Sequence, residues 1–146
     1  MSPEEKSKMY KRLESFRRLD EGWMVQADRR GNPVAEGGPI SDTAYAVAIE
    51  FIQGFPEIKE RLHVFPSTEH GVVFEIGESR GYQTVVEIER TGNIVSVLYD
   101  ADLPSGNPES DIFSADHAGF RETLEIIEKT YRRNSQRLPR EEEKQN

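Results

Sequence analysis

The chain has 146 residues, of which 35% are hydrophobic and 32% charged, and its 27 acidic and 19 basic side chains give a formal net charge of −8. This length favours a single domain with its own core, and the absence of cysteine excludes disulfides, thiolate metal sites and cysteine nucleophiles. The acidic residues concentrate between residues 21 and 118, which disfavours direct nucleic-acid binding and favours a basic protein partner. A role of the charge in solubility is the plainer alternative.

The first half of the chain predicts two helices separated by a long loop. Residues 3–20 have the pattern of an amphipathic helix. Its apolar stripe consists of Met9, Leu13, Phe16 and Leu19. Residues 22–40 are rich in glycine and proline and therefore predict an irregular loop. Ser41 is a good N-cap for a second, more apolar helix over residues 41–54.

The second half predicts a β-meander followed by a helix. Four short segments rich in β-branched and aromatic residues are bounded by turn residues, and they cover residues 61–65, 71–77, 82–89 and 94–99. Residues 100–116 contain several acids and no base, and they predict a second irregular stretch. A third helix is expected over residues 117–133. The polar residues 134–146 predict a disordered tail.

The order α-α-β-β-β-β-α predicts an α+β fold. We expect one domain over residues 1–133, with the helices packed on one face of a four-stranded antiparallel meander. The other face is expected to present polar side chains such as Glu75, Gln83, Glu87 and Glu89. The charged N-terminal segment is unlike a signal peptide, and the longest apolar run, Ala44–Ile49, is too short to cross a bilayer. We therefore expect a cytoplasmic protein that does not engage a membrane.

Few residues offer catalytic chemistry, and we expect a non-enzymatic protein without a cofactor. The chain has no nucleophile elbow, no P-loop and no dinucleotide-binding motif. The acids between residues 100 and 116, together with His117, could be imagined as metal ligands. Their spacing matches no metal loop, so a solvated acidic loop is the simpler interpretation. Glu87 and Glu89 share one face of a predicted strand, where exposure to solvent is expected rather than burial as an acid–base pair.

Trp23 is the only tryptophan, and it lies in the long loop. We expect it to fill the core between sheet and helices, because a single tryptophan in a small domain is usually structural. The alternative is an exposed aromatic anchor for a partner protein. Arg29 and Arg30 in the same loop are expected to be exposed, where they would add basic contacts to an acidic body.

Residues 22–99 carry several short motifs in a recognisable order. They are Gly22-Trp23, Pro39-Ile40-Ser41, Val64–Thr68, Val72–Ile76 and Thr91–Ile94. In this order they resemble a loose group of uncharacterised small bacterial and phage proteins, some encoded near toxin–antitoxin or other mobile-element loci. The chain departs from that pattern at Ser67, which interrupts a Pro-Thr step, and at Phe74 and Glu75, where a strand tryptophan is expected. The resemblance implies a mobile-element protein that acts by binding, and it supplies no catalytic residue.

Together these observations predict an acidic protein-binding module. It would act as an inhibitor or antitoxin-like neutraliser that occludes a basic surface, such as the nucleic-acid site of a toxin or of a defence nuclease. The residues expected to contact the partner are Asp100, Asp102, Asp111 and Asp116, with Trp23, Glu87 and Glu89 as secondary candidates. One alternative is a small-molecule or metal-binding domain with a pocket between the loops 22–40 and 100–116. A further alternative is a structural phage protein that self-associates, as a homodimer for example, through its first helix.

Overall fold

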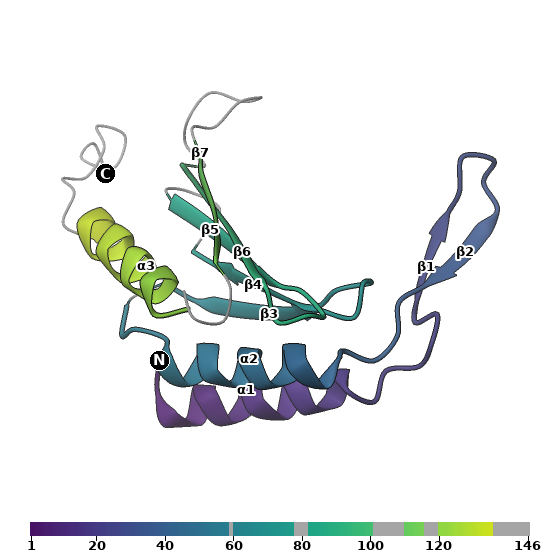
Figure 1. The fold of residues 1–146 in the computed structure, drawn as a ribbon, viewed down its shortest axis with the longest axis horizontal. Helices are drawn as coiled ribbons and strands as arrows, with labels where there is room; N and C mark the ends of the chain where they lie inside the picture. The colour runs from purple at the N-terminus through teal and green to yellow at the C-terminus, as the bar shows by residue number, and fades with distance from the viewer. Residues whose placement is uncertain (59, 78–81, 101–109, 116–119, 136–146) are drawn as a thin grey trace, which may run out of the picture.

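The computed structural model describes residues 1–58, 60–77, 82–100, 110–115 and 120–135. Over these residues the chain forms three helices, a β-hairpin and a five-stranded antiparallel sheet (Figure 1). The helices are α1 (Pro3–Phe16), α2 (Asp42–Gly54) and α3 (Phe120–Ser135). The hairpin joins β1 (Met24–Ala27) to β2 (Pro33–Glu36). The sheet consists, in spatial order, of β3 (Leu62–Pro66), β4 (Val72–Ile76), β5 (Tyr82–Ile88), β6 (Ile94–Asp100) and β7 (Ser110–Ala115).

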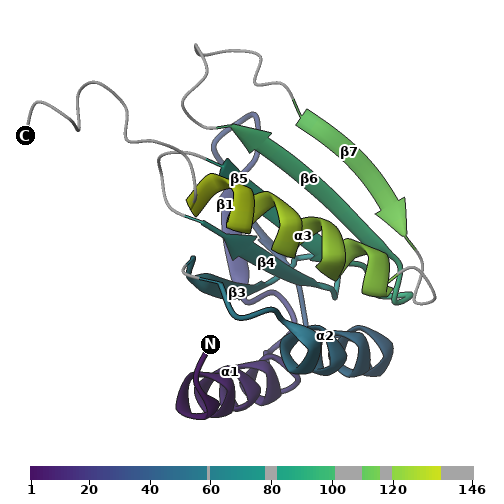
Figure 2. The ribbon, with the colours of Figure 1, turned by 90° about the vertical axis from the view of Figure 1, so that its left-hand side faces the viewer.

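The α+β class and the antiparallel meander are confirmed, and side chains of all three helices join the core on one face of the sheet. In Figure 2, α3 lies across this face, whereas α1 and α2 lie beneath β3. The alternation of buried residues along the strands defines the covered face. Its side chains pack with α1, α2 and α3 into one core, which on the sheet includes Val64, Val72, Phe74, Ile76, Val86, Ile88 and Ile94. Tyr131 fastens α3 to this sheet, because its buried hydroxyl bonds the Ile76 carbonyl at 2.8 Å and the Thr84 hydroxyl at 2.9 Å.

Serine side chains cap the first two helices, and the cap at Ser41 is the one predicted from the sequence. The hydroxyl of Ser2 accepts a hydrogen bond from the Glu5 amide at 3.2 Å, and that of Ser41 accepts one from the Ala44 amide at 3.0 Å. Each bond satisfies one of the amides that a helix leaves without an internal partner. The helices α1 and α2 thus start at defined residues and present their apolar faces to the sheet.

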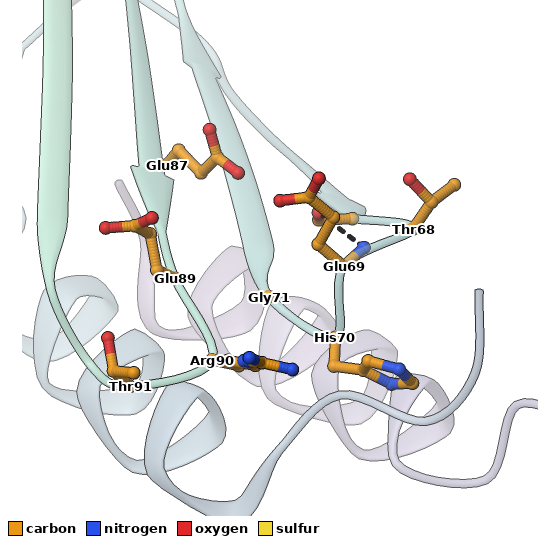
Figure 3. Close-up of a pocket in the computed structure, with 9 residues that line it drawn as sticks. Thr68, Glu69, His70, Gly71, Glu87, Glu89, Arg90 and Thr91 are labelled. Carbon is orange, nitrogen blue, oxygen red and sulfur yellow. Dashed lines mark hydrogen bonds between the residues drawn. The ribbon is translucent and has the colours of Figure 1, made fainter. Parts of the chain in front are cut away.

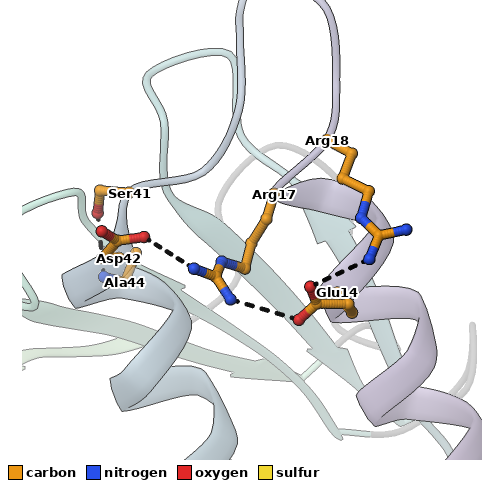
Figure 4. A network of polar contacts seen from close by, with 6 residues as sticks. All are labelled: Glu14, Arg17, Arg18, Ser41, Asp42 and Ala44. Carbon is orange, nitrogen blue, oxygen red and sulfur yellow. Dashed lines mark hydrogen bonds and ion pairs between the residues drawn. The ribbon is translucent and has the colours of Figure 1, made fainter.

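A polar network joins the end of α1 to the start of α2 (Figure 4). The guanidinium of Arg17 lies 3.4 Å from the Glu14 carboxylate and 3.2 Å from that of Asp42, and Arg18 approaches Glu14 at 3.6 Å. Arg17 also lies over the Tyr45 ring, 4.5 Å from its centroid. Asp42 is almost fully exposed and the other partners are also open to solvent, so water screens these ion pairs. The network orients the two helices and adds little to stability.

The structure differs from the predicted elements in four places. Helix α1 ends at Phe16 rather than near residue 20, because Arg17 and Arg18 close a turn with bonds to the carbonyls of Glu14 and Ser15. The predicted loop 22–40 contains the hairpin, and the predicted irregular stretch 100–116 contains β7, which makes the meander five-stranded. The tail 134–146 lies outside the described residues from 136 onward, whereas α3 extends through Ser135. No described helix is both long enough and apolar enough to span a bilayer.

Candidate functional site

One face of the sheet carries no helix among the described residues. In Figure 2, α3 lies in front of the sheet and the hairpin lies behind it, on the uncovered side. We name this side the open face and define it by the outward side chains of β3 to β6, which are His63, Phe65, Val73, Glu75, Gln83, Val85, Glu87 and Val95. All of them are exposed or half-buried, and Phe65 is 39% exposed. Of the polar side chains predicted for this face, Glu75, Gln83 and Glu87 lie on it, and Glu89 follows directly after β5.

Apolar and acidic side chains interleave across the open face. The strand register places Glu87 between Val73 on β4 and Val95 on β6. In the same way, Glu75 lies opposite Val85. Directly opposed residues of antiparallel strands have their Cβ atoms about 4.5–5.5 Å apart, so each carboxylate has a valine as its neighbour. The open face is therefore an apolar surface with negative charges set into it.

A hollow of about 600 Å³ lies at one end of this face (Figure 3). One wall of the hollow is the turn over residues 67–71, which joins β3 to β4. The other wall is the end of β5 with the turn that follows it, and consists of Glu87, Glu89, Arg90 and Thr91. The carboxylates of Glu69 and Glu87 point into the same space, whereas Arg90 and His70 lie at its lower margin. The predicted secondary pair Glu87 and Glu89 thus lines one wall of a real hollow.

Hydrogen bonds to the segment before α2 hold both turns in place. The Ser41 amide donates to the His70 carbonyl at 2.9 Å, and the Ser41 hydroxyl donates to the Arg90 carbonyl at 2.7 Å. The Nδ1–H of His70 donates to the Pro39 carbonyl at 2.9 Å, which fixes the tautomer of the ring. His70 has a φ of 67°, a conformation that non-glycine residues rarely adopt. The hollow is accordingly built from turns that are fixed against the body of the protein.

Partial burial, together with neighbouring carboxylates, raises the pKa of Glu87 above its ordinary value. The largest cause is burial among the open-face side chains, followed by the charges of Glu89 and then Glu69. Glu89 is held in place by a hydrogen bond of 2.7 Å that its carboxylate accepts from the Asn93 side chain. Glu87 therefore carries a negative charge that a neighbouring cation would stabilise.

Substitution of Glu87 by glutamine is expected to stabilise the free protein slightly at neutral pH, by up to about 0.5 kcal/mol, as is usual for a partly exposed position. A carboxyl whose pKa is raised by folding binds its proton more tightly in the native state, so its charge costs stability above that pKa and the cost disappears as the pH falls. The gain from Glu87→Gln should therefore vanish below the ordinary pKa of glutamate. Urea unfolding at neutral and acidic pH measures it, with Glu75→Gln as the exposed control. A gain that is equal at both pH values would contradict the assignment.

The four aspartates predicted as the main contacts are only partly placed by the structure. Asp100 ends β6 and pairs in register with Tyr82, and Asp111 lies in β7 opposite Leu98. Both thus belong to strands and not to an irregular acidic loop. Asp102 and Asp116 lie outside the described residues. Within the described ranges, no three histidine or acidic side chains come together in a way that could hold a metal ion.

Trp23 does not fill the core, so that expectation is wrong. Its half-buried indole lies at the base of the hairpin, where Nε1 donates to the Gly38 carbonyl at 3.1 Å. A side chain at Gly37 would collide with the ring, since a Cβ there would come within 2.5 Å of Nε1. The physical reason is local: the glycine pair lets the two ends of the hairpin close around the indole. Trp23 therefore fixes the base of the hairpin with part of its indole exposed, and its contact with a partner stays a prediction.

The first helix does not offer its apolar stripe for self-association. Leu13 and Phe16 are buried in the core, and Met9 and Leu19 pack partly buried against it. The sheet and α2 thus already occupy the surface that the self-association alternative requires. Of the proposed pocket between loops 22–40 and 100–116, residues 101–109 and 116 lie outside the described residues.

Comparisons with known proteins give no match: no family model, no curated protein and no solved structure resembles the chain. The resemblance drawn from the Gly-Trp loop and the later turns therefore stays a prediction. Reasoning from sequence had placed Glu87 and Glu89 on the outer face, but it missed Glu69, His70 and Arg90, which the turns bring beside them.

Proposed function

We propose that the open face is the docking site for a basic surface of another protein, and that the chain is a non-enzymatic inhibitor that occludes this surface. The single observation that carries the proposal is the uncovered sheet face, in which carboxylates are set between valines. Exposed apolar surface rimmed by polar residues is typical of protein-interaction sites. The acidity selects a basic partner, in keeping with the net charge of −8.

The carboxylates of the open face would be stabilised more by cationic side chains of a partner than by water alone. Glu87 is partly desolvated and repelled by Glu69 and Glu89, which raises its pKa. A lysine or arginine of the partner that enters the hollow would relieve this repulsion, and charge-assisted hydrogen bonds to carboxylates are among the strongest in proteins. In the free protein these carboxylates repel one another. In the complex, each would instead be paired with a cationic side chain of the partner.

Docking through the face is favoured over addition of a strand to β3, one of the two edge strands of the sheet. The edge strand β3 is blocked at two places, because the Val64 carbonyl accepts a hydrogen bond of 3.0 Å from Nε of Arg12, and Pro66 has no amide to donate. The Arg12 guanidinium also lies 5.9 Å from the centre of the Phe65 ring. Phe65 thus stands at the margin of the open face as an aromatic contact for the partner.

As an inhibitor the module would act by covering a positive surface that its target needs. The nucleic-acid site of a toxin or of a defence nuclease is a surface of this kind, since phosphate binding requires clustered lysine and arginine. Long-range attraction would speed encounter, and apolar contacts with Phe65, Val73 and Val95 would slow release.

The test is affinity capture by the tagged chain from a lysate of the encoding organism, followed by binding measurements on the purified captured protein. The variant Glu75→Lys/Glu87→Lys reverses two charges of the open face. The control Glu57→Lys/Glu125→Lys reverses two exposed acids outside it, with the same change in net charge. We expect the face variant to bind at least about tenfold more weakly and the control to bind like the wild type, with an affinity that falls as salt rises. Equal binding by the two variants would contradict the proposal.

A further inference from the structure

The hairpin β1–β2 stands away from the rest of the protein. It projects from the body on the side of the open face, opposite α3 (Figures 1 and 2). Every residue from Val25 to Glu36 is exposed. Its base is held by the Trp23 indole on Gly38 and by the Gly22 amide, which donates to the Gly37 carbonyl at 2.8 Å. A two-stranded hairpin without a packed face is only marginally stable in water, so this element is suited to being covered by another surface.

One face of the hairpin is wholly apolar. Residues directly opposite one another share a face, and the register pairs Val25 with Ala35 and Ala27 with Pro33. Val25 is 63% exposed, the highest exposure among the large hydrophobic side chains of the described residues. The pair Val25–Ala35 lies near the base of the hairpin, and the pair Ala27–Pro33 lies beside its tip. The apolar face therefore runs the length of the β1–β2 hairpin, which we name the arm.

The tip of the hairpin is basic. Asp28 opens the turn, and its carboxylate accepts hydrogen bonds of 2.8 Å from the amides of Arg30 and Asn32. Gly31 closes the turn with a φ of 82°. Asp28, the only acid of the tip, is thus hydrogen-bonded to the backbone of the turn. The side chains of Arg29 and Arg30 are exposed. The arm therefore combines an apolar face with two guanidinium groups.

The same chain carries the complementary surface. The open face holds Val73, Val85 and Val95 for apolar contact and Glu75 and Glu87 for a basic group, with Glu69 at its margin. Because the arm rises on the open-face side, a twofold axis can place the arm of each copy on the sheet of the other (Figure 1). Such an exchange is reciprocal, and it closes at two copies instead of growing into a filament.

We propose that the chain forms a homodimer by arm exchange, in which the β1–β2 hairpin of one copy lies on the open face of the second copy. Arg29 and Arg30 contact the carboxylates of Glu69, Glu75 and Glu87, and the apolar arm face covers the valines between them. The proposal shares the open face with the proposed function but does not depend on a foreign partner. A partner protein would have to displace the arm before it could dock.

Sedimentation equilibrium of the full chain at increasing concentration tests the proposal. We expect the wild type to change from monomer to a species of twice the monomer mass, with weaker association at high salt. The variants Arg29→Glu/Arg30→Glu and Glu69→Arg/Glu75→Arg should each associate at least about tenfold more weakly. The control Lys8→Glu/Lys11→Glu makes the same charge change as the arm variant on exposed positions of α1, and it should associate like the wild type.

Mixing the two charge-reversed variants is the decisive step. In the mixture an acidic arm meets a basic face and a basic arm meets an acidic face, so both contacts of the dimer are complementary again. We expect an equimolar mixture to regain the mass of a dimer, while matching melting curves show that each variant is folded. A wild type that stays monomeric at high concentration, or a mixture that does not associate, would overturn arm exchange. Either result leaves the capture of a foreign basic protein to be tested separately.

Discussion

Replacing Phe74 by alanine is expected to lower the free energy of unfolding by about 3–5 kcal/mol. Phe74 is fully buried in β4, a strand that lies between β3 and β5. Its ring stacks on that of Phe51 in α2, with the centroids 4.5 Å apart and the planes inclined by 26°. The substitution removes this ring contact between α2 and the sheet and leaves a cavity in the core.

Urea unfolding followed by circular dichroism measures this loss, and the neighbouring residue Val73 supplies the control. Val73 lies in the same strand but points to the open face, where it is half-buried. Val73→Ala should therefore cost less than about 1 kcal/mol, because it removes side-chain atoms that are already in contact with water. Similar losses for the two substitutions would mean that the faces of β4 have been assigned the wrong way round.

This contrast explains how much of the fold can be predicted from the sequence. The strand containing Val72, Phe74 and Ile76 alternates with a period of two, and the structure buries these three side chains. The helix after Ser41 has both a cap and a wide apolar face, and it too is found as predicted. Elements with a strong hydrophobic period and a clear boundary can thus be predicted from the sequence, because burial and local backbone preference favour the same structure.

The hairpin and β7 escape recognition for physical reasons. Every residue of the hairpin from Val25 onward is exposed, so burial imposes no periodicity on its sequence. The remaining signal is in the turn, where Asp28 and Gly31 occupy the first and last positions of a four-residue turn that favours these residue types. Strand β7 follows a stretch rich in proline and acids, and it is defined by its pairing with β6, which a local pattern does not report.

The candidate site was only half predictable for the same reason. The alternation over residues 82–89 places Glu87 and Glu89 on one face, and in the structure both line the hollow. Glu69 and Arg90 join them only because the bonds of Ser41 and His70 bring two turns to the start of α2. Contacts between residues so distant in sequence depend on the assembled fold. A pattern within one segment therefore identifies half of the hollow and not its opposite wall.

Replacing Gly71 by alanine is expected to cost about 1–3 kcal/mol and to deform the hollow. Gly71 is buried at the start of β4, and its backbone φ is one that any residue can adopt. A methyl group there would instead collide with the Ile88 carbonyl of β5. Because this oxygen belongs to the backbone of a paired strand, it cannot turn aside as a flexible side chain would. The turn over residues 67–71 must move away from the strand that carries Glu87 and Glu89.

Two measurements separate this steric effect from the general cost of replacing glycine. Gly31→Ala adds a side chain at a left-handed residue of the arm where nothing lies within 4 Å, so it should change global stability by less than about 1 kcal/mol. In the Gly71 variant, hydrogen exchange should also become faster at the Ser67 amide, which donates to the Gly71 carbonyl at 2.9 Å. If Gly71→Ala left both stability and Ser67 exchange unchanged, the close approach of β4 and β5 would not define the hollow. Binding by the open face would then have to be independent of the turn that carries Glu69.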